Sequence, residues 1–312
     1  MRMKSRLPTL VVVAILSPVT LLAQAPCKST VVGDLHIEHL QSKQYGDTRT
    51  LRVWLPPGYD EPANATKKYP VLYLFDGQTA FDDCTSFSGE HELRVDETVT
   101  LLIAEHRIDA MIVVGIDSTS RRSYEYPPYT DTVTDPGSPE PIGKQLPAFL
   151  SNEVLPYVSA HYRVTADPDQ TGIGGTSLGA VAALYVVLNR SDLFRLALIE
   201  SPTLPVGNGQ LLRDTAFLAR GPRKVAIGVG TTELSVPGAD QFVAHLGLTM
   251  EQANEGFYKM PQALAEHLKN AYLNHPEVDL VIEPGANHTS VSWARRLPEA
   301  IVFLYGTSKM TK

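Results

Sequence analysis

The order of apolar and polar positions along the chain predicts strands that alternate with helices. Residues 30–40 and 48–55 read as two strands joined by a polar turn, and in the second Leu51, Val53 and Leu55 alternate with Arg52 and Trp54. Continuous apolar runs, typical of strands buried on both faces, follow at residues 69–75 and 110–116. Later strands are predicted up to Gly174 and at 196–199, 224–230 and 278–283, and helices are predicted around 95–103, 146–162, 178–188, 249–273 and 292–305.

This alternation predicts an α/β fold built on a mainly parallel sheet with helices on both faces. The two opening strands add an antiparallel start, which is the arrangement of α/β-hydrolases. Reactive groups in such sheets lie beyond the carboxyl ends of the strands. Residues 117–140 show no periodicity, and a loop of that length is usually functional. We expect a single domain over residues 26–312.

The amino terminus has the pattern of a secretory signal peptide. Residues 1–6 are basic, residues 7–22 are mostly apolar, and Ala23-Gln24-Ala25 supplies a small-x-small end. A membrane anchor is the alternative, but the apolar run is short and contains Pro8 and Pro18. We therefore predict a signal peptide over residues 1–25, cleaved within 23–26, and a secreted or periplasmic protein without stable membrane insertion.

Charge and cysteine content add two further expectations. The formal net charge is −7 and becomes more negative once the basic head is removed, which argues against nucleic acid as a partner. The chain has two cysteines, Cys27 and Cys84. In an exported protein such a pair suggests one disulfide, although two unrelated thiols fit the sequence equally well.

The sequence Gly175-Thr-Ser-Leu-Gly179 matches G-x-S-x-G, the pattern of a serine on a tight strand-to-helix turn. A dinucleotide fingerprint would need glycine in place of Ser177, and a phosphate loop would need lysine in place of Ala180. Ser177 is therefore the candidate nucleophile, and the N–H of Leu178, at the head of the following helix, is a candidate donor to an oxyanion.

A serine hydroxyl needs a base, and in this fold the chain order is serine, acid, histidine. Of nine histidines, only His288 follows the last predicted strand. Glu233 comes directly after the strand at 224–230 and is the candidate acid, with Asp240 as the alternative. The second oxyanion donor is expected in the loop after the strand at 69–75, from the N–H of Gln78 or Gly77.

The chain resembles the putative esterase (esterase D-like) family of α/β-hydrolases, which is related to feruloyl esterases, siderophore esterases and mycolyl transferases. The segments that carry the resemblance run in order through nearly the whole chain: residues 53–59, 69–78, 94–97, 114–117, 122–126, 153–157, 162–163, 175–179, 201–202, 230–233 and 287–288 with Trp293. The resemblance implies Ser177, Glu233 and His288 as a triad, with the backbones of Gln78 and Leu178 as oxyanion donors.

Arg122 and Tyr126, in the long loop, are candidate substrate-binding residues within one of these segments. Two features depart from the family. Ala180 stands where a second glycine is common, and residues 234–258, a candidate cap over the site, match no part of the family pattern. No grouping of His, Cys, Asp and Glu has the spacing of a zinc motif, so we expect neither a metal nor a cofactor to be required.

The sequence thus favours an exported serine hydrolase that cleaves carboxylic esters, small or polymer-linked, through an acyl-enzyme. Two alternatives remain open. The same triad serves acyl transfer to an acceptor other than water, as in the mycolyl transferases. A non-catalytic binding protein on a hydrolase scaffold is the third interpretation, although a retired site has little reason to keep all three triad residues. Neither the acyl group nor the oligomeric state follows from the sequence.

Overall fold

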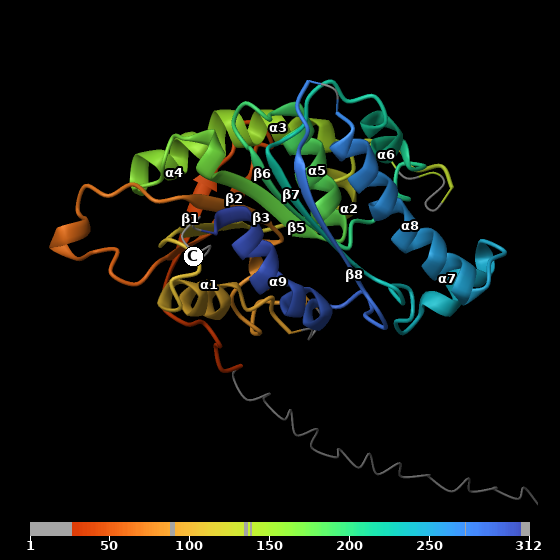
Figure 1. The fold of residues 1–312 in the computed structure, drawn as a ribbon, viewed down its shortest axis with the longest axis horizontal. Coiled ribbons are helices and arrows are strands. Elements are labelled where there is room, and N and C mark those ends of the chain that lie inside the picture. The colour runs from red at the N-terminus through yellow and green to blue at the C-terminus, as the bar shows by residue number, and fades with distance from the viewer. Residues whose placement is uncertain (1–26, 88–90, 134–136, 138, 272, 307–312) are drawn as a thin grey trace, which may run out of the picture.

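A mixed β-sheet organises the part of the chain that the structure describes. The computed structural model describes residues 27–87, 91–133, 137, 139–271 and 273–306, and the predicted signal peptide lies outside them. Within this part, eight strands form one sheet in the order β1-β2-β4-β3-β5-β6-β7-β8 (Figure 1). The strands are β1 (Asp34–Gln41), β2 (Thr48–Leu55), β3 (Val71–Phe75), β4 (Ile112–Ile116), β5 (Thr171–Thr176), β6 (Leu196–Glu200), β7 (Lys224–Gly230) and β8 (Glu277–Glu283).

The pairing of the strands confirms the predicted fold class. β1 runs antiparallel to β2, and β2 runs antiparallel to β4. From β4 through β3 to β8, every neighbouring pair is parallel. The carboxyl ends of β3 to β8 therefore lie along one edge of the sheet, which is the edge where the predicted site residues follow their strands.

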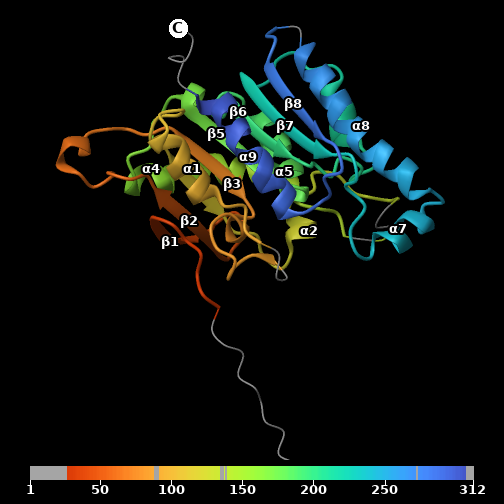
Figure 2. The same cartoon turned by 60° about the horizontal axis from the view of Figure 1, so that its bottom comes forward.

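Helices cover both faces of the sheet, because its central strands are apolar on both sides. Along β3, Val71, Tyr73 and Phe75 belong to one core cluster, whereas Leu72 and Leu74 belong to the other. The first face carries α3 (Leu146–Phe149), α4 (Leu155–His161), α5 (Leu178–Asn189) and α8 (Met250–Lys269), and the second carries α1 (Val95–Ala104) and α9 (Ser290–Tyr305) (Figure 2). Shorter helices are α2 (Arg122–Glu125), α6 (Gln210–Thr215) and α7 (Ala239–His245).

Several elements differ in their bounds from the sequence-based expectation, and two of the differences have a clear structural cause. The first strand starts at Asp34 because the preceding residues form an arm whose N–H groups bond to side chains: Thr30 donates to Asp82 (3.2 Å) and Val32 to Asp96 (2.6 Å). The predicted helix at 146–162 is divided by a π-helical turn, Leu150–Val154, that ends just before Pro156. A proline lacks the N–H that would continue regular helical pairing, which accounts for the irregular turn.

Cys27 and Cys84 form a disulfide, which decides between the two interpretations left open by the sequence. The bridge ties the amino-terminal arm to the segment that follows β3. The arm also donates from the hydroxyl of Ser29 to Asp82 (2.8 Å), so covalent and hydrogen-bonded links hold it in the same place. Among the described residues, no helix is both long enough and apolar enough to span a membrane.

Candidate active site

Ser177 lies at the turn between β5 and α5, in a backbone conformation that is rare for a residue with a side chain (φ 58°, ψ −125°). The flanking glycines are required by close contacts. A Cβ on Gly175 would lie 2.6 Å from the backbone carbon of Gly179, and one on Gly179 would lie 2.7 Å from a carboxylate oxygen of Asp76. The G-x-S-x-G pattern thus encodes a tight elbow pressed against the loop that follows β3.

The structure brings the three predicted triad residues into one hydrogen-bonded chain. Nε2 of His288 lies 2.7 Å from Oγ of Ser177, and Nδ1 lies 2.6 Å from Oε2 of Glu233. With its proton on Nδ1, the imidazole donates to Glu233 and accepts from the serine hydroxyl. Glu233 is fully buried, and the histidine side chain is 22% exposed. Asp240, the alternative acid, lies exposed on α7.

The carboxylate of Glu233 is held on its other side by two donors. The hydroxyl of Ser201 donates to Oε1 (2.6 Å), and the N–H of Gly230 donates to the same oxygen (2.5 Å). Burial raises the pKa of Glu233, but the bonds from His288, Ser201 and Gly230 outweigh burial and lower the pKa below its usual value. The acid is therefore ionised at neutral pH and able to stabilise an imidazolium.

A buried arginine supports this acid from behind. In α9, Arg296 donates to Oγ of Ser201 (3.1 Å), to Glu200 (2.9 Å) and to Glu283 (2.8 Å). Arg296 and Glu200 are 7% and 2% exposed. Gly228 leaves the space for Glu200, since a Cβ there would lie 2.3 Å from both carboxylate oxygens. Sequence reasoning missed this network, in which Ser201 and Glu200 come from the end of β6.

The two predicted oxyanion donors lie on neighbouring turns. Leu178 is the first residue of α5, so its N–H has no acceptor within the helix. Gln78 lies in a short 3-10 helix, Gly77–Thr79, and its side chain is fixed to Ser118 by bonds of 2.6 and 3.0 Å. A Cβ on Gly77 would lie 2.5 Å from the backbone of Gly115, so only glycine lets this turn pack so closely on β4.

Arg122 and Tyr126 lie against the same loop. The guanidinium of Arg122 donates two bonds of 2.7 Å to Asp76, and Tyr126 Oη accepts the N–H of Asp76 (3.3 Å). Asp76 adopts the left-handed conformation (φ 61°), and these contacts hold it there. Tyr126 is buried, whereas the Arg122 side chain is 25% exposed. Their predicted role in substrate binding stays a prediction, and their contacts here brace the turn that carries Gln78.

Three further residues contact the triad; the sequence named Trp293 only as part of the family resemblance and gave no role to Thr203 or Phe257. The hydroxyls of Thr203 and Ser177 lie 3.2 Å apart. The rings of Trp293 and Phe257 contact the His288 ring edge-on, at centroid distances of 5.0 and 5.8 Å. Because Phe257 belongs to α8, the stretch that departs from the family pattern reaches the imidazole.

The side-chain amide of Asn254 joins the start of that stretch to α8. Oδ1 of Asn254 accepts the N–H of Leu234 (2.7 Å), and its Nδ2 donates to the hydroxyl of Ser235 (3.2 Å). Asn254 lies in α8 and is buried. The chain therefore leaves Glu233, forms α7, and returns in α8 beside its point of departure.

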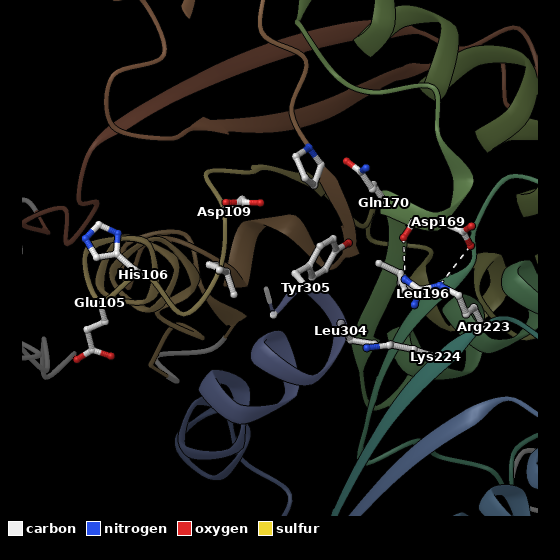
Figure 3. Close-up of a pocket in the computed structure, with 13 residues that line it drawn as sticks. Glu105, His106, Asp109, Asp169, Gln170, Leu196, Arg223, Lys224, Leu304 and Tyr305 are labelled. Carbon is white, nitrogen blue, oxygen red and sulfur yellow. Dashed lines mark hydrogen bonds and ion pairs between the residues drawn. The ribbon is translucent and has the colours of Figure 1, made fainter. Parts of the chain in front are cut away.

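A large cavity lies elsewhere in the molecule. Its volume is about 890 Å³, and it is lined by Pro70, Leu196 and Lys224, at the amino-terminal ends of β3, β6 and β7. Figure 3 shows Asp169 beside Arg223 in this cavity and Tyr305 near Leu304. Because Ser177 and Glu233 follow the carboxyl ends of β5 and β7, the cavity lies at the opposite end of the strands and is not part of the candidate site.

Comparison with known proteins agrees with this description. A family model described as putative esterase matches residues 42–303. The uncharacterized protein YbbA of Bacillus subtilis (strain 168) is 21% identical over 275 residues, which cover 86% of this chain and 98% of that protein. An endo-1,4-beta-xylanase/feruloyl esterase of Xylanibacter ruminicola is 26% identical over 158 residues, but this covers 49% of this chain and only 19% of that protein.

Among solved structures, the siderophore hydrolase EstA from Aspergillus nidulans has a similar fold, with a TM-score of 0.66 and 20% identity. The superposition covers 87% of this chain and 94% of that one. At this identity the likeness establishes the fold alone.

Proposed function

The chain belongs to the putative esterase family and is a hydrolase that acts on esters, and from this premise we propose a serine mechanism carried by Ser177, His288 and Glu233. The observation that supports the proposal most strongly is the unbroken chain of hydrogen bonds from Oγ of Ser177 through the imidazole to Glu233, with links of 2.7 and 2.6 Å. Each group has the partner that its role requires.

In the proposed acylation step, Nε2 of His288 takes the proton of Ser177 as Oγ attacks the ester carbonyl. Glu233 holds the imidazole in the required tautomer and stabilises the imidazolium, because its carboxylate is ionised and buried. The N–H groups of Leu178 and Gln78 stabilise the oxyanion. The imidazolium then returns its proton to the departing alcohol, and an acyl-enzyme forms.

In the second step, water attacks the acyl carbonyl and gives a proton to His288, and the imidazolium then returns that proton to Oγ of Ser177 as the carboxylic acid departs. The contacts around the site support a rigid arrangement for both steps. The side chain of Gln78 is fixed by Ser118, and Asp76 is fixed by Arg122. Donors held in place before the reaction need no reorganisation when charge develops.

We also propose that the protein is exported. The basic and apolar pattern of residues 1–25 supports this, as does the pairing of Cys27 with Cys84, because disulfides persist in oxidising compartments. The names of similar proteins, a feruloyl esterase and a siderophore hydrolase, suggest feruloyl esters and siderophores as the substrates to try first.

The test compares wild-type protein with Ser177→Ala on a panel of short-acyl, long-acyl, feruloyl and lactone esters. The variant removes the nucleophile and little volume, so turnover should fall about 10⁴-fold or more while thermal unfolding stays near that of the wild type. A serine-reactive fluorophosphonate should label the wild type and not the variant. Retention of more than about a tenth of wild-type turnover would contradict the serine mechanism.

A further inference from the structure

Three carboxylates gather where α1 begins, on the sheet face opposite α5. Glu92 precedes the helix, and Asp96 and Glu97 lie in its first turn. One ligating oxygen from each lies within 4.8 Å of the others. Glu92 and Asp96 are 3% and 0% exposed, so two of the three acids are removed from solvent.

Each of these carboxylates keeps one buried oxygen without a hydrogen-bond partner in the described part of the chain: Oε2 of Glu92, Oδ1 of Asp96 and Oε2 of Glu97. The other Asp96 oxygen accepts the N–H of Val32 (2.6 Å). Arg94 contacts Glu97 (3.3 Å), but its side chain is 64% exposed and it is one cation beside three acids. Buried, unpartnered carboxylate oxygens are costly unless something binds them.

Either protons or a bound cation can stabilise these unpartnered carboxylate oxygens. Burial, with help from the neighbouring carboxylates, raises the pKa of Glu92 to about 7 and that of Asp96 to about 8. Protons relieve repulsion within the cluster, and one can be shared between Asp96 and Glu97, but Oε2 of Glu92 still has no partner among the described residues. A metal ion can bind all three carboxylates at once, and oxygen-only donor sets suit hard divalent cations.

We propose that Glu92, Asp96 and Glu97 bind one calcium ion. Calcium takes six to eight oxygen ligands at about 2.3–2.6 Å in flexible geometry, and oxygens within 4.8 Å of one another need only small shifts to share such an ion. Glu92 and Glu97 also line an open cavity of about 670 Å³, which admits water to complete the shell. Magnesium demands near-ideal octahedral geometry at about 2.0–2.1 Å and fits this spread less well.

The ion would fasten the arm to the body of the domain. Asp96 already holds the arm through Val32, and the disulfide of Cys84 lies in the same segment. That segment returns to the turn carrying Gln78, because the N–H of Leu93 donates to the carbonyl of Thr79 (2.8 Å). The site is therefore structural and goes beyond the proposed ester chemistry.

The test uses the chain without its predicted signal peptide, stripped with EDTA and passed into metal-free buffer. Isothermal titration calorimetry should show about one calcium ion bound per chain, with a Kd in the range of about 10⁻⁴–10⁻³ M that is typical of extracellular calcium sites. Thermal unfolding in 10 mM calcium should shift upward by about 3–6 °C. Asp96→Asn should weaken binding at least about tenfold and abolish the shift.

Glu97→Gln is the second variant, because its partly exposed side chain makes misfolding less of a concern, and it should weaken binding similarly. Glu251→Gln is the matched control, since it removes an exposed carboxylate from the first turn of α8, and it should bind calcium as the wild type does. Ester turnover at 25 °C should not change on chelation, so this test does not depend on the role of Ser177.

Three results would overturn the proposal. One is the absence of saturable calcium binding by the wild type up to 10 mM, which would leave protons as the occupants of the cluster. Another is undiminished binding in both Asp96→Asn and Glu97→Gln, which would place any calcium elsewhere. The third is magnesium binding as tight as calcium binding, which would contradict the choice of ion.

Discussion

Replacing Arg296 with methionine removes the cation that joins Ser201, Glu200 and Glu283 behind Glu233. Methionine keeps much of the volume, so the change acts mainly on charge. Glu200 is 2% exposed and loses its nearest counter-charge, whereas Glu283 is 26% exposed and keeps Arg295 at 2.9 Å. Most of the effect should therefore come from Glu200.

Breaking a buried ion pair by removing one partner typically costs about 3–5 kcal/mol, because the other charge stays buried and uncompensated. We expect a loss of this size in the free energy of unfolding at pH 8. Replacing both charges, as in Glu200→Gln with Arg296→Met, removes the uncompensated charge, and this double variant should lose only about 1–2 kcal/mol. With the single variant Glu200→Gln added, these losses complete a double-mutant cycle that gives the coupling energy between the two residues.

The loss in the free energy of unfolding caused by Arg296→Met should depend on pH. Burial raises the pKa of Glu200 to about 7 although Arg296 opposes the rise, so without Arg296 the pKa rises further. A carboxyl with a raised pKa in the folded state stabilises the fold while protonated, and that stability is lost as the pH rises through the folded pKa. The deficit relative to the wild type should therefore grow above pH 7.

Urea unfolding followed by circular dichroism at pH 5.5, 7 and 8.5 measures these quantities. Turnover on a model ester should fall about 3- to 30-fold without a matching rise in KM, because Ser201 loses its anchor but keeps its bond to Glu233. A loss of stability below about 1 kcal/mol at pH 8.5, or a double variant no more stable than the single one, would refute the reasoning.

Two further predictions concern the acid and the disulfide. Glu233→Gln should lower turnover about 10²–10⁴-fold with little change in stability, whereas Asp240→Asn should change turnover less than about twofold. The reverse result in steady-state assays would assign the acid to Asp240. Replacing Cys27 and Cys84 by alanine should cost about 4 kcal/mol in urea unfolding, from the chain entropy of a 57-residue separation. Two reactive thiols in the unreduced, denatured wild type would contradict the bridge.

The sequence predicted the parts of the molecule that depend on local patterns. The strand Lys224–Gly230 has the predicted bounds because its apolar run is continuous and ends at a polar turn. The tight strand-to-helix turn at Ser177 could be predicted because it needs Gly175 and Gly179 at a fixed spacing. His288 was the candidate base because, of the nine histidines, it alone follows the last predicted strand. Chain order alone left Asp240 open as the acid.

Features that depend on packing between distant elements were not predicted. Arg296 reads as an ordinary charge on an amphipathic helix, and its burial depends on how α9 lies over the ends of β6 and β7. Glu92, Asp96 and Glu97 have the spacing of acids near a helix start, and only the surrounding core buries Glu92 and Asp96. The short helices α6 and α7 carry too few turns for a periodic signal.

The hydrogen bonds of the Asn254 side chain to Leu234 and Ser235 have a consequence for protein engineering. Because this amide holds Leu234 and Ser235 beside α8, residues 236–253 form an excursion with both ends fixed at one point. Exchanging such an excursion changes loop-closure entropy only slowly with length. Libraries or grafts confined to residues 236–253 leave Glu233 and its hydrogen-bond donors unchanged. They alter the first turn of α8, the helix that also contains Phe257 beside His288. Substrate preference can then be varied by laboratory evolution separately from the reaction itself.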